Sequence, residues 1–272
     1  MTTSTILHLS DLHVQARADH PHNRRLGGLV ARIVADYRAV QPIVIITGDL
    51  VDDGERAQYR ELLRLLRPIK DAGLKILAAP GNHDCGPMGN SYLASARVEY
   101  QRHVVADLMG IGVADTASDV MANLYPMVHR IDGITYVGLD SVVGMIGGGM
   151  HFARGAVGAP QLAKLRTIID YDHGRQPIVV YLHHHPFDRN FTMALRDSAE
   201  LMAVLANRVD LLLFGHEHRV DVWPGPHRPI LHGIRGIIAS GQTTAEQGGT
   251  CEVHRACFAA GQLALTAIRL AV

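Results

Sequence analysis

Five short polar clusters stand directly after apolar runs, and their side chains are of the kinds that bind metal ions and move protons. Each apolar run has the length and composition of a buried strand. In an open parallel sheet the ends of such strands meet at one edge, where ligands bind. We therefore expect side chains from distant parts of the chain to meet there, from the clusters Asp11-Leu12-His13, Gly48-Asp49, Gly81-Asn82-His83-Asp84, His183-His184-His185-Pro186 and Gly215-His216-Glu217-His218.

Two of the clusters carry ligand-type side chains two residues apart. Such residues point to the same side of an extended strand end, so Asp11 can act with His13, and His216 with His218. The carboxylate of Asp49 can bridge two cations, one on each oxygen. Counting donors then predicts two groups that share this aspartate: Asp11, His13, Asp49 and His218 in the first, and Asp49, Asn82, His184 and His216 in the second.

The predicted cofactors are two divalent transition-metal ions. Mixed nitrogen and oxygen donors without thiolate suit Mn, Fe, Zn, Co or Ni rather than Mg or Ca. Two such ions, about 4 Å apart, form the clamp that serves in-line displacement at phosphorus. Their charge exceeds that of the two carboxylates by about +2, enough to hold a bridging hydroxide and to attract an anionic phosphate.

His83 lies in the same turn as Asn82 but is not needed as a ligand. Asp84 beside it is expected to orient and charge the imidazole, which makes His83 the candidate proton donor to a leaving alkoxide. We therefore predict that His83 and Asp84 take part in catalysis. Asn82 and His83 are also predicted to contact the substrate, with His22, in the loop after the first ligand pair, as a further candidate.

The bulk composition is that of a soluble globular protein, because 47% of the 272 residues are hydrophobic and 19% are charged. A formal net charge of zero supplies no long-range field for nucleic acid or acidic lipid. The chain start lacks the features of a secretory signal, no apolar run approaches the length of a membrane span, and the three cysteines suggest no disulfide framework. We therefore expect a cytoplasmic protein without nucleic-acid or membrane partners.

Apolar runs rich in β-formers alternate with amphipathic stretches of helix length, which is typical of an α/β fold. After Gly215 the pattern changes to short runs joined by Gly and Pro turns, which predicts mostly antiparallel strands over 219–272 within one domain covering 1–272. These strands could support a homodimer or a higher homo-oligomer. The Gly144–Gly149 stretch predicts a loop, either an ordinary surface loop or a cover over the site. Helices are predicted over 26–40, 55–66, 92–109, 162–169 and 193–205.

Taken in order, the five motifs resemble those of the calcineurin-like metallophosphoesterase superfamily. They extend from Asp11 to His218, about three quarters of the chain, and are specific only in combination. The resemblance implies a four-layer α/β/β/α sandwich of two mixed sheets, with a dinuclear metal site at the carboxyl edge of the strands. It also implies the ligands named above and His83 as the acid. In this family the ligand usually lies two residues before the proline, which selects His184 over His183 and His185.

The compact size and the Leu139-Asp140-Ser141 context are most similar to bacterial class III cyclic-nucleotide phosphodiesterases and related glycerophosphodiesterases. The resemblance thus implies hydrolysis of small phosphodiesters by a metal-bridging hydroxide. A phosphomonoesterase or nuclease of the same fold is the alternative enzyme, and a metal-free scaffold that binds protein partners is the non-enzymatic alternative. Phe187 stands where relatives often carry a second proline, which leaves the shape of the pocket wall open.

Overall fold

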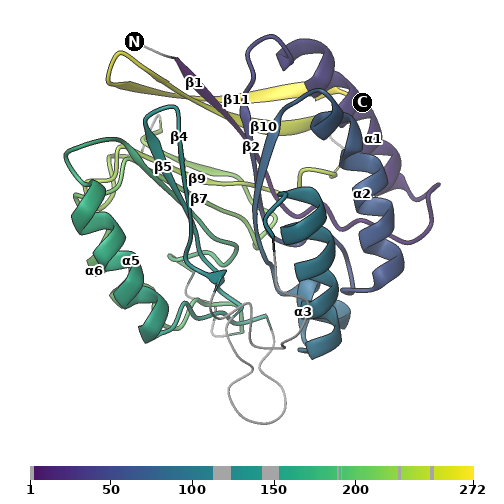
Figure 1. Cartoon of the computed structure of the whole chain (residues 1–272), viewed down its shortest axis with the longest axis horizontal. Helices are drawn as coiled ribbons and strands as arrows, with labels where there is room; N and C mark the ends of the chain where they lie inside the picture. Colours follow the sequence, from purple (N-terminus) through teal and green to yellow (C-terminus); the bar gives the residue numbers. More distant parts are fainter. Residues whose placement is uncertain are drawn as a thin grey trace.

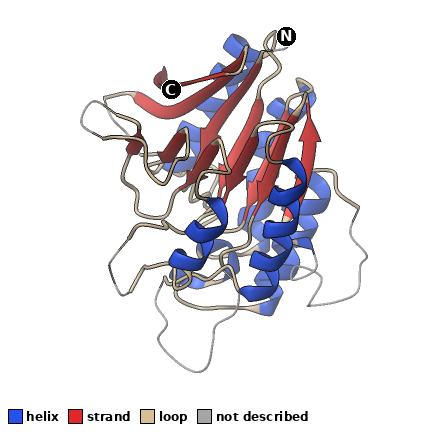
Figure 2. Ribbon diagram, turned by 90° about the vertical axis from the view of Figure 1, so that its left-hand side faces the viewer, coloured by secondary structure: helices blue, strands red, loops and turns tan. Residues whose placement is uncertain are grey.

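Two β-sheets pack face to face in the computed structural model, and helices cover the outer face of each sheet (Figure 1). The helices α1, α2 and α3 lie along one side, and α5 and α6 along the other. Figure 2, turned by 90°, shows the strands as a twisted array between helices. This arrangement confirms the four-layer α/β/β/α prediction. The structure describes residues 3–112, 124–142, 153–188, 190, 192–225, 228–245 and 248–272.

The first sheet has the strand order β11-β10-β1-β2-β3. Its strands β1, β2 and β3 are parallel, whereas β10 is antiparallel to both β1 and β11. The helices α1 and α2 connect the parallel strands, as expected of β-α-β units. The bounds are β1 (Ser4–Leu9), α1 (Pro21–Tyr37), β2 (Ile43–Thr47), α2 (Arg56–Asp71), β3 (Lys75–Ala79), β10 (Thr250–Ala259) and β11 (Gln262–Ala271).

The second sheet has the strand order β4-β5-β6-β7-β9-β8. Its four central strands are parallel, and the edge strands β4 and β8 are antiparallel to their neighbours. Both sheets are therefore mixed, as predicted. The bounds are β4 (Met127–Ile131), β5 (Ile134–Gly138), α5 (Ala159–Asp172), β6 (Ile178–Tyr181), α6 (Ser198–Leu205), β7 (Leu211–Phe214), β8 (Asp221–Trp223) and β9 (Gly236–Ala239).

The predicted helices are present with shifted ends. The helix expected over 92–109 consists of α3 (Ala94–Tyr100), which continues directly as a π-helix (Gln101–Leu108). Two short 3₁₀ turns precede it, His83–Cys85 and Pro87–Gly89. The loop expected over 144–149 falls outside the described residues.

The C-terminal segment is divided between the two sheets. Strands β10 and β11 form an antiparallel pair, as predicted, but they extend the first sheet beside β1. Strands β8 and β9 complete the second sheet, where β9 is parallel to β7. The segment therefore contributes mostly antiparallel strands, and it completes the edges of both sheets.

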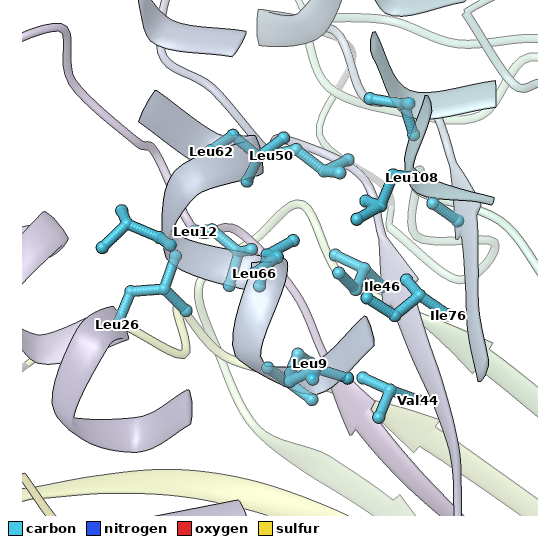
Figure 3. Close-up of a cluster of buried hydrophobic side chains, with 14 of the residues drawn as sticks. Leu9, Leu12, Leu26, Val44, Ile46, Leu50, Leu62, Leu66, Ile76 and Leu108 are labelled. Atoms are coloured by element: carbon cyan, nitrogen blue, oxygen red, sulfur yellow. The ribbon is translucent and has the colours of Figure 1, made fainter. Parts of the chain in front are cut away.

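The core of the first half lies between the first sheet and its helices (Figure 3). Leu62 and Leu66, one turn apart on α2, point into this cluster, where they meet Leu9, Val44 and Ile46 from the sheet. Burial of a leucine or isoleucine side chain stabilises a fold by roughly 2 kcal/mol, so the apolar face of α2 holds this helix against the sheet. A second cluster lies under α5 and α6, and a third fills the space between the sheets.

The carboxyl ends of strands from both sheets meet across the sandwich. The backbone N–H of Asp11, after β1, donates to the carbonyl of Gly48, after β2. The backbone N–H of Gly215, after β7, donates to the carbonyl of His183, after β6. The ring of His183 then bonds to the carbonyl of Thr47 in the other sheet. Among the described residues no helix is long and apolar enough to cross a bilayer.

Candidate metal centre

Five of the predicted ligands have a backbone in the left-handed region. This region is costly for residues other than glycine, and such strain concentrates at functional sites. The sequence predicted that Asp11 and His13 point to the same side because the strand end is extended. That reason was wrong. Left-handed turns, not an extended backbone, aim these side chains at one point. The φ angles are 54° for Asp11, 46° for His13, 49° for Asp49, 81° for His216 and 52° for His218.

The first predicted group of donors assembles as expected, because ligand atoms of Asp11, His13, Asp49 and His218 all lie within 4.8 Å of one another. Nε2 of His13 lies 3.1 Å from Nε2 of His218, which in turn lies 3.3 Å from Oδ1 of Asp11. This Oδ1 is buried and accepts no hydrogen bond from the described residues. Converging imidazole nitrogens beside an unbonded carboxylate oxygen are the donor set that a transition metal requires.

The second group contains Asp49, Asn82 and His216 as predicted, but its remaining imidazole is that of His183. Nε2 of His183 lies 3.3 Å from Oδ2 of Asp49, 2.9 Å from Oδ1 of Asn82 and 3.0 Å from Nδ1 of His216. The assignment of His184 to this group therefore needs correction.

His184 belongs to a different set of contacts. Its Nδ1 lies 2.9 Å from the hydroxyl of Ser141, which also accepts the His184 backbone N–H. Its ring packs at 4.5 Å, centroid to centroid, against the ring of His216, so it borders the group without entering it. The physical reason is the direction of the chain after β6, which turns the ring of His183, and not that of its neighbour, toward Thr47 and Asp49.

One oxygen of Asp49 faces both groups. Oδ2 lies 3.3 Å from Nε2 of His183 and 3.9 Å from Nε2 of His13, whereas Oδ1 accepts the backbone N–H of His83 at 2.9 Å. A bridge with one cation on each oxygen is thus not what the geometry offers, because Oδ1 is already engaged. Glycine is required at position 81, where a Cβ would collide with the backbone and carboxylate of Asp49.

Two of the candidate ligands are held in the tautomer that binds metals. Nδ1 of His13 donates to Oδ1 of Asp52 at 3.0 Å, and Nδ1 of His183 donates to the carbonyl of Thr47 at 2.8 Å. Each bond turns Nε2 toward the site, where it can bind a metal once its proton is displaced, an arrangement typical of metal-binding histidines. Asp52 was not among the residues predicted for the site, and its position three residues after Asp49 is the signal that the sequence offers for this role.

The charges of the site depend on one another. Burial disfavours a charge on His13, but its bond to Asp52 raises the pKa of His13 to about 9. Burial likewise opposes a charge on His183, whereas the neighbouring Asp49 raises its pKa to about 9. Against the effect of its own burial, the charge of His183 holds the pKa of Asp49 well below the usual range. Protons therefore compensate a buried carboxylate here, and cations would take the place of those protons.

His83 and Asp84 have different surroundings, although they are adjacent. Nδ1 of His83 donates to the carbonyl of Asp52 at 2.7 Å, and the ring packs edge-on against His13. The carboxylate of Asp84 is fully buried and accepts three backbone N–H groups, those of Leu50, Val51 and Gly81.

The prediction that Asp84 orients and charges His83 was therefore wrong. Asp84 ties the loop after β2 to the loop after β3, and Asp52 holds the imidazole of His83 instead. Burial raises the pKa of Asp84 to about 7.

The predicted substrate contacts line the same site. The amide nitrogen of Asn82 donates to the carbonyl of Gly89 at 3.1 Å, which turns Oδ1 toward His183. His22 is half-buried, and its Nδ1 lies 3.4 Å from the carbonyl of His13. All three predicted contact residues, His83 included, thus lie at or beside the candidate centre.

Comparison of the fold agrees with this description. The purple acid phosphatase PPD1 from seeds of yellow lupin (Lupinus luteus) superimposes with a TM-score of 0.60 at 14% sequence identity. The superposition covers 98% of this chain and 51% of the plant enzyme. At this identity the likeness concerns the fold alone.

Comparison of the sequence identifies the family. The chain is 28% identical over 225 residues to the cAMP/cGMP dual specificity phosphodiesterase of Mycobacterium tuberculosis, and 25% identical over 234 residues to a 3',5'-cyclic-nucleotide phosphodiesterase of Nostoc sp.. These alignments cover 78 and 79% of this chain, but 61 and 71% of the two relatives. The family model for calcineurin-like phosphoesterases matches residues 4–220. The expected resemblance is thereby confirmed, and the chain belongs to the calcineurin-like phosphoesterase family.

Proposed function

We propose that this chain is a dinuclear-metal-dependent phosphodiesterase that hydrolyses small phosphodiesters, with cyclic nucleotides as the first substrates to test. The observation that carries the proposal is that two groups of metal donors meet at a single oxygen of Asp49. The names of the two relatives support the choice of substrate class. Because the chain spans only 61% of the mycobacterial protein, activity and substrate are properties to be measured on this chain itself.

The donor atoms suit two divalent transition-metal ions, Mn, Fe, Zn or Co. Asp11, His13, Asp49 and His218 would hold one ion, and Asp49, Asn82, His183 and His216 the other. Bound there, such ions would supply the positive charge that stabilises an in-line displacement at phosphorus.

The protein's own groups orient the reaction. The carbonyl of Gly89 holds the amide of Asn82, whose Oδ1 faces the second group. The carbonyl of Asp52 holds Nδ1 of His83, which leaves Nε2 as the nitrogen that transfers a proton to the departing oxygen. The side chain of His83 is 22% exposed, so a substrate can reach it, whereas His183 is completely buried.

The other two predicted functions differ in what they need. A phosphomonoesterase or nuclease would use the same donors with a different substrate. A scaffold that binds protein partners has no need for five donor residues with strained backbones. It also has no need for a buried carboxylate oxygen without a hydrogen bond, such as Oδ1 of Asp11.

The test is a substrate panel with the purified chain reconstituted in Mn²⁺. We expect turnover of cyclic AMP, glycerophosphocholine or bis-nitrophenyl phosphate that exceeds turnover of mono-nitrophenyl phosphate, and loss of all activity in Asp49→Asn. Strong monoester turnover with negligible diester turnover would instead identify a phosphatase. Metal analysis separates the non-enzymatic alternative, because an absence of bound metal after reconstitution would point to a scaffold.

A further inference from the structure

A cavity with a volume of about 490 Å³ lies between the two sheets. Its walls come from β8, β9, β10 and β11 and from Val220, Pro224, Gly225 and Arg228 beside β8. None of the candidate metal ligands lines it. Volumes of 300 to 1,000 Å³ are usual for small-molecule sites, so the cavity is large enough for a ligand. Its lining is mostly apolar, with Val222, Pro224, Ile238, Leu265 and Ala267 among the residues that form it.

One polar side chain in this cavity has no hydrogen-bond partner among the described residues. The imidazole of His254 is 1% exposed, and neither of its ring nitrogens is bonded. The nearest carboxylate oxygen, Oε1 of Glu252, lies 3.6 Å from Nε2, beyond hydrogen-bond distance. Its cross-strand neighbour His8 lies 6.3 Å away between ring centroids and bonds instead to Thr47. Buried polar groups in folded proteins are nearly always bonded, so this imidazole needs a partner.

The charges around the cavity compensate one another. The guanidinium of Arg228 lies 2.6 Å from a carboxylate oxygen of Asp221 and stands 4.7 Å above the ring of Trp223. Burial lowers the pKa of His254, so its imidazole is neutral and offers one N–H donor and one nitrogen acceptor. A negatively charged ligand would find no uncompensated cation among the lining residues.

We propose that this cavity is a second binding site, which takes a neutral small molecule with an apolar body and one amide or hydroxyl group. The apolar body would lie against Val222, Ile238 and Leu265, and the polar group would bond to His254. The site is independent of the metal centre and of the phosphodiesterase proposal.

Benzamide and benzoate are a matched pair of probes, since they share a size and differ in charge. Isothermal titration calorimetry measures the binding of each probe directly. We expect saturable binding of benzamide and no binding of benzoate. His254→Phe keeps the ring but removes both nitrogens, and should weaken benzamide binding about tenfold or more.

Two further variants make the result specific. His129→Phe alters a half-buried histidine on β4, at the opposite edge of the second sheet from β8, and should leave binding unchanged. Ala267→Phe fills the cavity from the exposed strand β11 without changing a buried residue, and should abolish binding even if His254→Phe does not fold. The proposal is overturned if benzamide shows no saturable binding, if benzoate binds equally well, or if both cavity variants bind benzamide as the unaltered chain does.

Discussion

Nε2 of His183 lies 3.3 Å from Oδ2 of Asp49, although the two residues follow strands of different sheets. His183 follows β6, and Asp49 follows β2. The same imidazole bonds through Nδ1 to the carbonyl of Thr47, the last residue of β2. One side chain thus joins the carboxyl edges of both sheets at the point where the two groups of donors meet.

This relationship predicts different behaviour of two adjacent histidines. His183→Gln should lower the manganese content by one equivalent and abolish diester hydrolysis, because it removes a donor atom from the second group. His184→Gln should retain both equivalents, since His184 bonds to Ser141 outside that group. Elemental analysis of both variants after reconstitution tests the assignment. A loss of metal in His184→Gln with retention in His183→Gln would restore the assignment made from the sequence.

Asp52 should affect metal affinity without being a ligand. Asp52→Asn weakens the acceptor that holds Nδ1 of His13, and loss of such a supporting bond typically costs about 10- to 100-fold in metal affinity or activity. The matched control is Asp53→Asn, because the carboxylate of Asp53 bonds to Gln58 and to the backbone of Met88. Manganese titration followed by activity measures both variants. Equal affinities would show that the Asp52 carboxylate does not support His13.

His83 should matter most for substrates with poor leaving groups. His83→Ala removes the proton donor, which is worth about 100-fold or more for an alkoxide such as that released from cyclic AMP. A nitrophenolate needs little protonation, so hydrolysis of bis-nitrophenyl phosphate should fall far less, with metal content unchanged. Rates of the variant and of the unaltered chain on both substrates test this prediction. Equal slowing of both substrates would show that His83 is not the proton donor.

Asp84 should affect stability. Its carboxylate accepts the N–H groups of Leu50, Val51 and Gly81, so Asp84→Ala leaves three buried donors without a partner. We expect a loss on the order of 3 kcal/mol or more in the free energy of unfolding. Urea denaturation monitored by circular dichroism measures it. A stability equal to that of the unaltered chain, with activity lost, would return Asp84 to the catalytic role expected from the sequence.

The buried histidines His8 and His254 should make the fold sensitive to acid. Burial lowers the pKa of both below the ordinary value of about 6.5, that of His8 strongly. As the pH falls, the unfolded chain therefore takes up a proton at each of these histidines before the folded chain does. Their contribution to stability is fully present above about pH 6.5 and is lost as the pH falls below it, by up to about 1.4 kcal/mol per pH unit for each histidine.

His254→Gln should flatten this dependence, while His173→Gln, at an exposed position, should not. The free energy of unfolding in urea, compared at pH 7.5 and pH 5.5, gives the slope for each variant. The same slope in His254→Gln as in the unaltered chain would show that this histidine takes up its proton in the folded state as well.

Much of the site can be predicted from local patterns. An apolar run followed by Asp, His or Asn specifies both a strand and a donor at its carboxyl end, and parallel strands bring those ends together. Residues such as Asp11, His13, Asp49 and His216 could therefore be placed in one centre from the sequence, together with the fold that holds them.

Only the tertiary structure decided which imidazole of the histidine cluster faces Asp49, and what Asp52 and Asp84 do. These outcomes depend on backbone angles beyond the strand ends and on partners far away in the chain, such as Thr47 for His183 and Leu50 for Asp84. A local pattern records which side chains are present and where a strand ends. It does not record the left-handed turns that aim those side chains, because backbone bonds to distant segments accompany them, such as those from Asp11 and His13 to the loop after β2.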